Sequence, residues 1–216
     1  NNLLIQDVSL NFVSDKNLTL INSLNAKYKD ISISNGSLII KRNKQIDIEG
    51  KFNSQFNLNE NEIDKLLSKS RIKFLEKNKV NIKGSLLHNF SLRIDENFKL
   101  IDYDYKSEGN ISESQITLEN DFKSNFIDKP IKEFSIIQTN LAINYNNKNN
   151  NILILDGLYN FGGSENKKFK ISYDLNKKNP KYLIDIDLAQ NIFLKFINFK
   201  SNYKNASNIK SEINFK

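Results

Sequence analysis

The chain has no cysteine, no tryptophan and no methionine, and His88 is its only histidine. The absence of cysteine excludes disulfides, thiolate metal sites and cysteine nucleophiles. No signal peptide is visible in the sequence, and no apolar run is long enough to span a bilayer as a helix. Since no methionine starts the chain, we expect it to be an interior or processed piece of a larger protein.

Charge of one sign is not concentrated in any segment, although the formal net charge is +7. Arginine is rare among the 32 basic residues, and the lysines are scattered among Asp and Glu along the chain. A nucleic-acid surface would cluster its charge and favour arginine, whose planar fork matches phosphate. We therefore predict no nucleic-acid partner, and we attribute the abundant Lys, Asn and Ile to A- and T-rich codons.

What the sequence does contain is alternation of apolar and polar residues with a period of two, which is typical of half-buried β-strands. Val8, Leu10 and Phe12 show this pattern near the start of the chain. Further along, Asn35-Gly36 is a dipeptide that favours hairpin turns. We therefore predict a three-stranded meander over residues 28–57.

A helical pattern replaces the alternation over residues 59–76. A stripe with the spacing of one helix face is formed there by Ile63, Leu66, Leu67, Ser70 and Phe74. Asn59 or Asn61 could cap its start, where nearby acidic residues favour the positive end of the helix dipole. This is the only helix that we predict.

Strands resume at Val80 and continue to the end of the chain. They are predicted at 80–84, 90–94, 100–105, 109–118, 134–145, 152–159, 169–173, 182–188 and 209–215. Because parallel pairing requires crossover connections that the chain lacks, we expect mostly antiparallel pairs. The predicted fold is mainly β. It is a single segment, residues 1–216, with strands over 1–57, a helix over 59–76 and strands over 80–216.

A sheet with one apolar face must hide that face. Two sheets can stack as a sandwich, or one sheet can close into a barrel. Alternatively, the sheet can curl into an open groove that something else fills. A lipid acyl chain would suit such a groove, because each buried methylene contributes about 0.8 kcal/mol. The alternation alone does not choose among these three.

Two passages of the chain carry a family resemblance. In one, a strand ending in Asp185-Ile-Asp-Leu188 is followed by an apolar strand at 194–199, by Lys200 and by a strand that ends in Phe215. The other passage, residues 63–94, pairs a short helix with two strands. Both resemble recurring passages of the AsmA-like superfamily, which includes the large YhdP and TamB relatives. The Trp-Pro and Gly-Trp pairs that the family often carries there are absent.

The resemblance implies a fold and a function. AsmA-like proteins are anchored in the bacterial inner membrane, cross the periplasm and form long β-grooves thought to conduct phospholipids toward the outer membrane. By this resemblance the chain would be a section of a curled, partial-barrel groove wall in the periplasm. Its partners would be phospholipid acyl chains, the inner membrane through a segment not present here, and periplasmic or outer-membrane proteins.

No residue pattern points to catalysis, to a metal or to a cofactor. His88 falls in Leu87-His-Asn89, where we expect an exposed turn, and no nucleophile elbow accompanies it. Asp102/Asp104 and Asp185/Asp187 are spaced as a Ca²⁺ site or a glycosidase dyad could use. Apolar residues alternate with them, so we assign both pairs to the solvated face of half-buried strands. Gly162-Gly163 lacks the Lys and helix of a phosphate loop.

The leading hypothesis is therefore a non-enzymatic lipid groove, with no catalytic residue, metal or cofactor. We predict that its lining includes Leu38, Ile40, Ile46, Ile48, Phe90, Leu92, Ile152, Ile154, Ile184 and Ile186. The alternative is a β-sandwich adhesin or fibre module that binds through polar loops such as residues 146–151. An outer-membrane barrel is less favoured, because most predicted strands fall short of the roughly ten residues that cross a bilayer.

Overall fold

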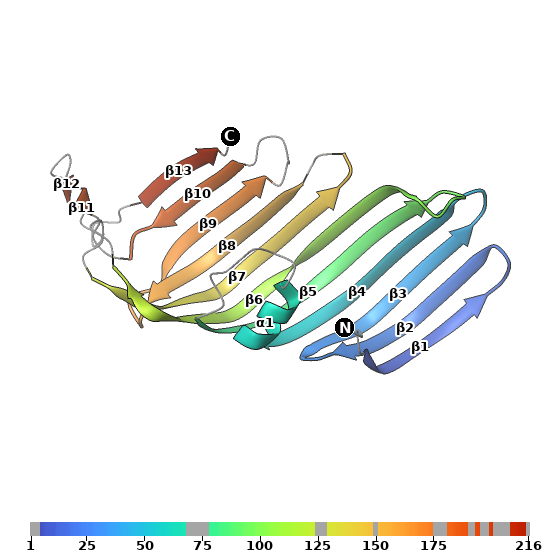
Figure 1. The fold of residues 1–216 in the computed structure, drawn as a ribbon, viewed down its shortest axis with the longest axis horizontal. Coiled ribbons are helices and arrows are strands. Elements are labelled where there is room, and N and C mark those ends of the chain that lie inside the picture. Colours follow the sequence, from blue (N-terminus) through green and yellow to red (C-terminus); the bar gives the residue numbers. More distant parts are fainter. Residues whose placement is uncertain are drawn as a thin grey trace.

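A computed structural model describes residues 5–67, 78–123, 129–148, 151–174, 181–189, 193–194, 199–200 and 208–214. The elements are β1 (Gln6–Ser14), β2 (Leu18–Tyr28), β3 (Ile31–Arg42), β4 (Ile46–Asn59), α1 (Glu60–Leu67), β5 (Lys79–Ile94), β6 (Leu100–Phe122), β7 (Ile131–Asn146), β8 (Ile152–Phe161), β9 (Lys167–Asp174), β10 (Lys181–Asp187), β11 (Phe193–Leu194), β12 (Phe199–Lys200) and β13 (Asn208–Asn214). Figure 1 shows β1 to β10 in chain order across one long sheet.

Each strand from β1 to β9 pairs with the next one along the chain, and β10 pairs with β13. All pairs in this 11-stranded sheet are antiparallel, and β11 and β12 form a separate small pair. The sheet has two edges, β1 and β13, and is not closed. The prediction of a mainly β, antiparallel, open sheet is therefore confirmed, and the described strands do not form two stacked sheets.

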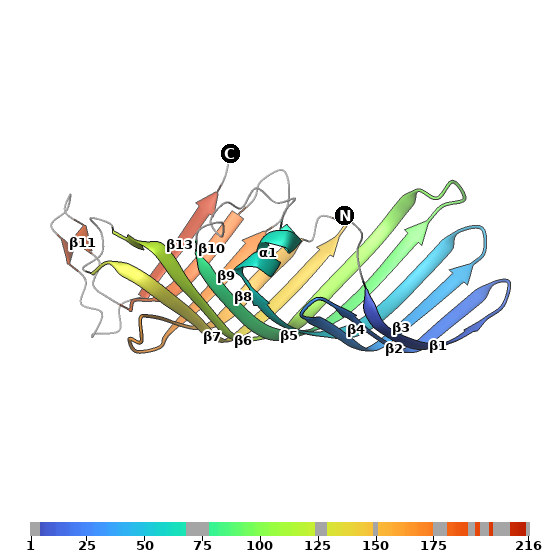
Figure 2. The same ribbon diagram turned by 60° about the horizontal axis from the view of Figure 1, so that its bottom comes forward.

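The sheet is strongly curved, and α1 lies over its concave side (Figure 2). Small residues on this side leave room for aromatic rings from the adjacent strand. The ring of Phe90 covers Gly50, and the ring of Phe56 covers Gly84, where an added Cβ would lie 2.7 Å from the ring. Pairs of this kind support curved sheets, because the glycine leaves space that the neighbouring ring fills.

The predicted hairpin at Asn35-Gly36 is wrong. Strand β3 runs straight through these residues, and Asn35 adopts a φ of 53° while the register shifts between Ser34 and Ser37. The dipeptide therefore forms a β-bulge, which uses the same left-handed conformation as a hairpin turn without reversing the chain.

Two further predicted breaks are absent. Residues 80–94 belong to the single strand β5, and residues 100–118 to the single strand β6, which has 23 residues. The polar residues at the expected turns lie within these strands and pair across the sheet, as His88 does with Ser107.

The start of α1 agrees with the sequence, which offered Asn59 as one of two possible caps. The Asn59 Oδ1 accepts hydrogen bonds from the backbone N–H groups of Asn61 and Glu62, at 3.0 and 3.3 Å. In return, the Glu62 carboxylate accepts one from the Asn59 N–H at 2.9 Å. This reciprocal arrangement is a capping box. Residues 68–76 of the predicted helix lie outside the described residues.

Candidate functional site

The pairing register sorts the strands into two faces. We call the one that carries Ile46 and Ile48 the apolar face, and the opposite one the outer face. Directly paired residues of antiparallel strands share a face, and Ile48 is paired with both Ile40 and Leu92. The register places eight of the predicted residues on the apolar face: Leu38, Ile40, Ile46, Ile48, Phe90, Leu92, Ile184 and Ile186.

Ile152 and Ile154 are on the other face, so their predicted inward orientation is wrong. Ile152 is paired with Asn144, and Ile154 with Ala142, while Leu153 and Leu155 between them point to the apolar face. All four positions of this run are apolar, and alternation therefore assigns it no face. Asp156, which shares the outer face with Ile154, was the signal in the sequence that could have given the correct assignment.

The C-terminal half of the apolar face is hollowed. An open cavity of about 330 Å³ has only hydrophobic and aromatic side chains in its lining, those of Leu118, Phe122, Ile131, Phe134, Ile136, Tyr159, Phe161, Phe169, Ile171 and Ile186. Small-molecule pockets normally combine an apolar wall with a few polar groups that orient the ligand. This wall offers almost none, and it therefore suits a ligand part that has no polar atoms.

The one hydroxyl group in this wall, that of Tyr159, already forms a hydrogen bond within the protein. The Tyr159 hydroxyl donates a hydrogen bond to the Asp187 carbonyl oxygen at 2.6 Å. Burial raises the pKa of Tyr159 to about 12. The phenol is therefore neutral at any ordinary pH, and its ring contributes to the wall as an apolar surface.

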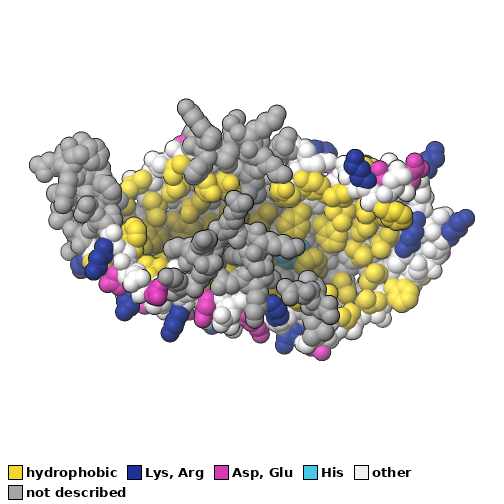
Figure 3. All heavy atoms as spheres, in the orientation of Figure 1, with side chains coloured by type: hydrophobic (Ala, Val, Ile, Leu, Met, Phe, Trp, Pro, Cys, Tyr) yellow, Lys and Arg dark blue, Asp and Glu magenta, His cyan; other side chains and the backbone are white. Residues whose placement is uncertain are grey.

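Most of the apolar face is only half-buried. Among the described residues, the buried hydrophobic side chains other than Leu188 form two small clusters. One joins Ile63 of α1 to Val80 and Ile116, and the other centres on Tyr159 and Phe169. Hydrophobic side chains gather over a wide area of this side of the molecule in Figure 3. An apolar surface of this extent usually marks an interaction site.

His88 was expected in an exposed turn, and this expectation is wrong. It lies in the middle of β5, on the apolar face, with only 8% of its surface exposed. The ring stacks on Phe52 with centroids 4.4 Å apart. Its Nε2 lies 2.7 Å from the Ser54 Oγ, and its Nδ1 lies 2.8 Å from the Tyr105 hydroxyl. Burial lowers the pKa of His88, so the neutral imidazole is favoured.

The sequence contained a signal for this placement too. His88 stands between Leu86 and Phe90 in an unbroken period-two series, which puts it on the apolar phase of the strand. The neighbouring residues Leu87 and Asn89 belong to the opposite phase of the strand and do not interrupt that series. We call Ser54, His88 and Tyr105 the polar chain of the apolar face.

Tyrosine pairs lie near one end of the strands on the same face. Tyr103 stacks on Tyr145 with centroids 5.5 Å apart, and Tyr173 stacks on Tyr182 at 4.0 Å. A hydrogen bond to Tyr145 raises the pKa of Tyr103, and burial, followed by a hydrogen bond to Tyr173, raises that of Tyr182. These neutral phenols combine an apolar ring with a polar tip, as side chains at an apolar–water boundary do.

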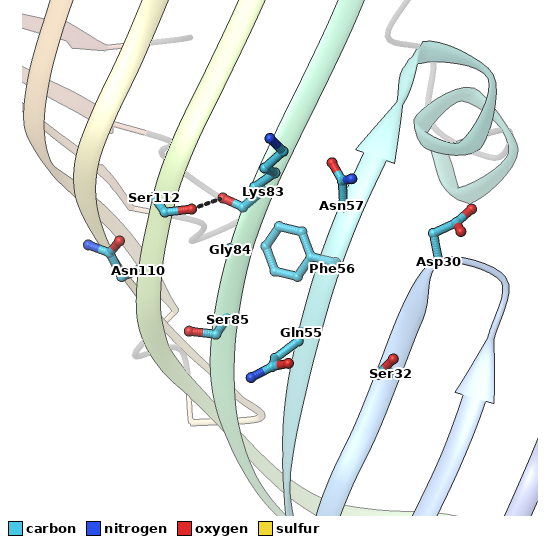
Figure 4. A pocket seen from close by; sticks show the side chains of 10 residues that line it. All are labelled: Asp30, Ser32, Gln55, Phe56, Asn57, Lys83, Gly84, Ser85, Asn110 and Ser112. Atoms are coloured by element: carbon cyan, nitrogen blue, oxygen red, sulfur yellow. Dashed lines mark hydrogen bonds between the residues drawn. The ribbon is translucent and has the colours of Figure 1, made fainter.

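A second hollow, of about 440 Å³, lies among polar side chains of β3 to β6 (Figure 4). Its lining is Asp30, Ser32, Gln55, Phe56, Asn57, Lys83, Gly84, Ser85, Asn110 and Ser112. The Ser112 hydroxyl donates to the Lys83 carbonyl oxygen at 3.2 Å. Register assigns Gln55, Ser85 and Asn110 to the outer face, so this hollow is separate from the apolar one.

The aspartate pairs occupy the outer face, as predicted. Asp185 lies between Lys170 and Lys210 in the register, and the amide of Asn208 donates to both Asp185 and Asp187, at 2.7 and 3.0 Å. The hydrogen bond from Asn208 and the nearby lysines hold the pKa of Asp185 below its usual value. This pair is therefore engaged in cross-strand contacts.

Two features are absent from the described residues. No three side chains of the His, Asp or Glu type converge there in a way that could hold a metal ion. Likewise, none of the described helices is long and apolar enough to cross a membrane.

The fold and the site define a class: an open antiparallel sheet with one long apolar face, a hollow in that face, and a polar outer surface. Compared with protein-family models, with curated proteins and with solved structures, the chain matches none of them. The function is therefore argued from the geometry of the two faces.

Proposed function

We propose that this chain is a non-enzymatic segment that shields lipid acyl chains on its apolar face during phospholipid transport between membranes. The observation that carries the proposal is the hollow between Phe134 and Ile186, whose lining consists of hydrophobic and aromatic side chains alone. An acyl chain is long and free of polar atoms, and it gains free energy from such a wall in proportion to the apolar area removed from water.

The continuity of the apolar face supports the same ligand. In register, apolar residues succeed one another across the sheet, for example from Leu155 to Ile171 and on to Ile184. A compact ligand would need one pocket, whereas an extended chain can use a surface that crosses many strands. The resemblance to AsmA-like proteins adds a location to this proposal: the periplasm, with an inner-membrane anchor in a segment not present here.

Adjacent residues on opposite faces allow a sharp test. A photo-reactive benzoylphenylalanine is placed at Leu155 or Ile40 of the apolar face, or at Ile154 of the outer face. Each variant is irradiated with phosphatidylethanolamine–phosphatidylglycerol vesicles and analysed by mass spectrometry. We expect lipid adducts at Leu155 and Ile40 and almost none at Ile154. Capture that is equal at Leu155 and Ile154, or absent from both apolar-face positions, contradicts the proposal.

A polar interaction module is the second candidate, and the hollow of Figure 4 is the observation that favours it. Its amides and hydroxyls, including those of Gln55, Asn57 and Ser85, could hydrogen-bond a polar partner. The described strands form one open sheet, so this candidate no longer takes the form of a sandwich. Substituting Gln55 and Asn57 with Ala would impair a polar module but leave lipid capture at Leu155 unchanged.

A further inference from the structure

The polar chain crosses three strands in the middle of the apolar face. Ser54 is on β4, His88 on β5 and Tyr105 on β6. Along their own strands they are flanked on this face by uncharged residues only, which are Phe52, Phe56, Leu86, Phe90, Tyr103 and Ser107. Polar side chains in such surroundings are stable only when their hydrogen-bonding groups find partners.

Within the polar chain, one hydrogen-bond donor has no partner among the described residues. The two hydroxyls and the neutral imidazole carry three polar hydrogens, but the chain contains only two hydrogen bonds, Ser54–His88 and His88–Tyr105. In either imidazole tautomer, one hydroxyl hydrogen is left over. None of the other described residues forms a hydrogen bond with the Ser54 or Tyr105 hydroxyl.

Burial identifies the hydroxyl that keeps its hydrogen available. Ser54 is 5% exposed, whereas Tyr105 is only half-buried. A free O–H on Ser54 would be enclosed without an acceptor, and this arrangement costs more than a free O–H that reaches the open surface. The favoured arrangement has Ser54 donating to Nε2 and Nδ1–H donating to the Tyr105 oxygen. The Tyr105 O–H is then available to donate to a group other than Ser54 and His88.

A second polar atom, beside the polar chain, also lacks a partner among the described residues. Ser107 is paired with His88 across the strands and is fully buried, and its Oγ forms no hydrogen bond with any described residue. The apolar face therefore has an unsatisfied polar spot at this point, in contrast to the distant hollow at Tyr159, where the hydroxyl is satisfied.

From this geometry we infer that Tyr105 donates a hydrogen bond to the ester carbonyl oxygen of an acyl lipid lying on the apolar face. An ester carbonyl accepts hydrogen bonds, carries no charge and sits at the head of the acyl chain. A phosphate or a carboxylate would need a cation, and the described residues that flank the polar chain on this face carry no charge. His88 and Ser54 are positioning residues that hold the Tyr105 oxygen as an acceptor and so direct its hydrogen outward. This inference rests on the proposed function.

The test is a competition between two lipids that differ only in their two ester carbonyl groups. The 216-residue chain is mixed with equal amounts of dipalmitoyl phosphatidylcholine, a diester, and its dihexadecyl diether analogue. Native mass spectrometry then measures the ratio of the two complexes. One neutral hydrogen bond contributes about 0.5–1.5 kcal/mol, so we expect the diester to be preferred by about two- to tenfold.

Two matched variants locate the effect. Tyr105→Phe should bring the ratio to about one, because it removes the donor and keeps the ring. Tyr103→Phe makes the same change on the same face and should keep the wild-type preference, because Tyr103 is not part of the polar chain. Circular dichroism checks that both variants retain the sheet.

Each other result counts against the inference in a distinct way. If the wild-type chain binds both lipids equally, the inference fails while the proposed function stands. If Tyr105→Phe keeps the preference, the assignment to Tyr105 fails. If neither lipid binds the wild-type chain, both the inference and the proposed function fail.

Discussion

Gly109 of β6 faces Leu86 of β5 so closely that a Cβ added to the glycine would lie 2.8 Å from the Leu86 Cα. The Ser85 carbonyl oxygen, also part of the backbone, would be nearer still. Real Cβ atoms do not approach backbone atoms this closely, and a paired strand cannot rotate away as a side chain can. The two central strands of the curved sheet therefore need glycine at this position.

Gly109→Ala should accordingly destabilise the sheet. Overpacking typically costs about 1–3 kcal/mol, and a clash with backbone belongs at the upper end of that range. Gly50→Ala is the control, because its new Cβ would meet the ends of the Phe90 and Leu38 side chains, which can move. Urea unfolding of both variants measures the difference, and equal losses of stability would contradict this account.

Ile63 holds α1 against the sheet. It is 6% exposed and packs with Val80 and Ile116. Truncating a buried isoleucine to alanine costs about 2–5 kcal/mol, and a short isolated helix has no comparable stability of its own. Ile63→Ala should therefore release α1, with faster backbone hydrogen exchange in residues 60–67. The exposed Asn61→Ala should leave exchange unchanged, and protection retained in Ile63→Ala would show that other contacts hold the helix.

The lowered pKa of His88 predicts a pH dependence of stability. Burial disfavours the imidazolium in the folded state, while the unfolded chain binds a proton near its ordinary value of about 6.5. Below that pH the unfolded state binds more protons, so stability falls as pH decreases from about 6.5 toward the folded pKa. The melting temperature of the wild-type chain should drop between about pH 7 and pH 5.

His88→Phe keeps a ring beside Phe52 and removes the titrating group, so its melting temperature should change less over the same pH range. Asp15 and Asp185 do not affect this comparison of the two melting temperatures between about pH 5 and pH 7. Their pKa values are lowered, mainly by hydrogen bonds from the backbone N–H of Asn17 and from the Asn208 side chain respectively. Their contributions are lost only below about pH 4. A parallel decline in both proteins would assign the effect to other groups.

Leu155 and Ile154 provide a fourth test, one of face assignment. Leu155→Asp would place a charge beside Tyr159 and Phe169, whereas Ile154→Asp would place it on the outer face beside Ala142 and Ser172. Charging the apolar face should cost at least about 2 kcal/mol more than charging the outer face. Chemical denaturation of the two variants measures this. A greater loss in Ile154→Asp would reverse the assignment made from the register.

Much of the fold could be predicted because alternation is a local property. The antiparallel meander follows from strand succeeding strand without crossovers, and the start of α1 follows from Asn59 and Glu62. Strand lengths could not be predicted in the same way. His88 and Asn35-Gly36 resemble breaks locally, but pairing with neighbouring strands continues through them.

The candidate site was only partly predictable for a related reason. Wherever polar residues fix the phase, as Asp47 and Glu49 do around Ile48, the predicted apolar side chains lie on the apolar face. In the fully apolar run at 152–155 the phase depends on which atoms of β7 and β9 are hydrogen-bonded to it. The polar chain was missed because its three members are far apart in sequence.

By itself, the sequence determined that this chain forms β-strands with one apolar side and that they pair mainly with their sequence neighbours. The reason is that side-chain alternation and the lack of crossover segments act locally. Only the tertiary structure decided that the sheet stays open, that Leu155 rather than Ile154 lies on the apolar face, and that Ser54, His88 and Tyr105 meet. Those outcomes depend on register and curvature, which are set by contacts between strands and not within them.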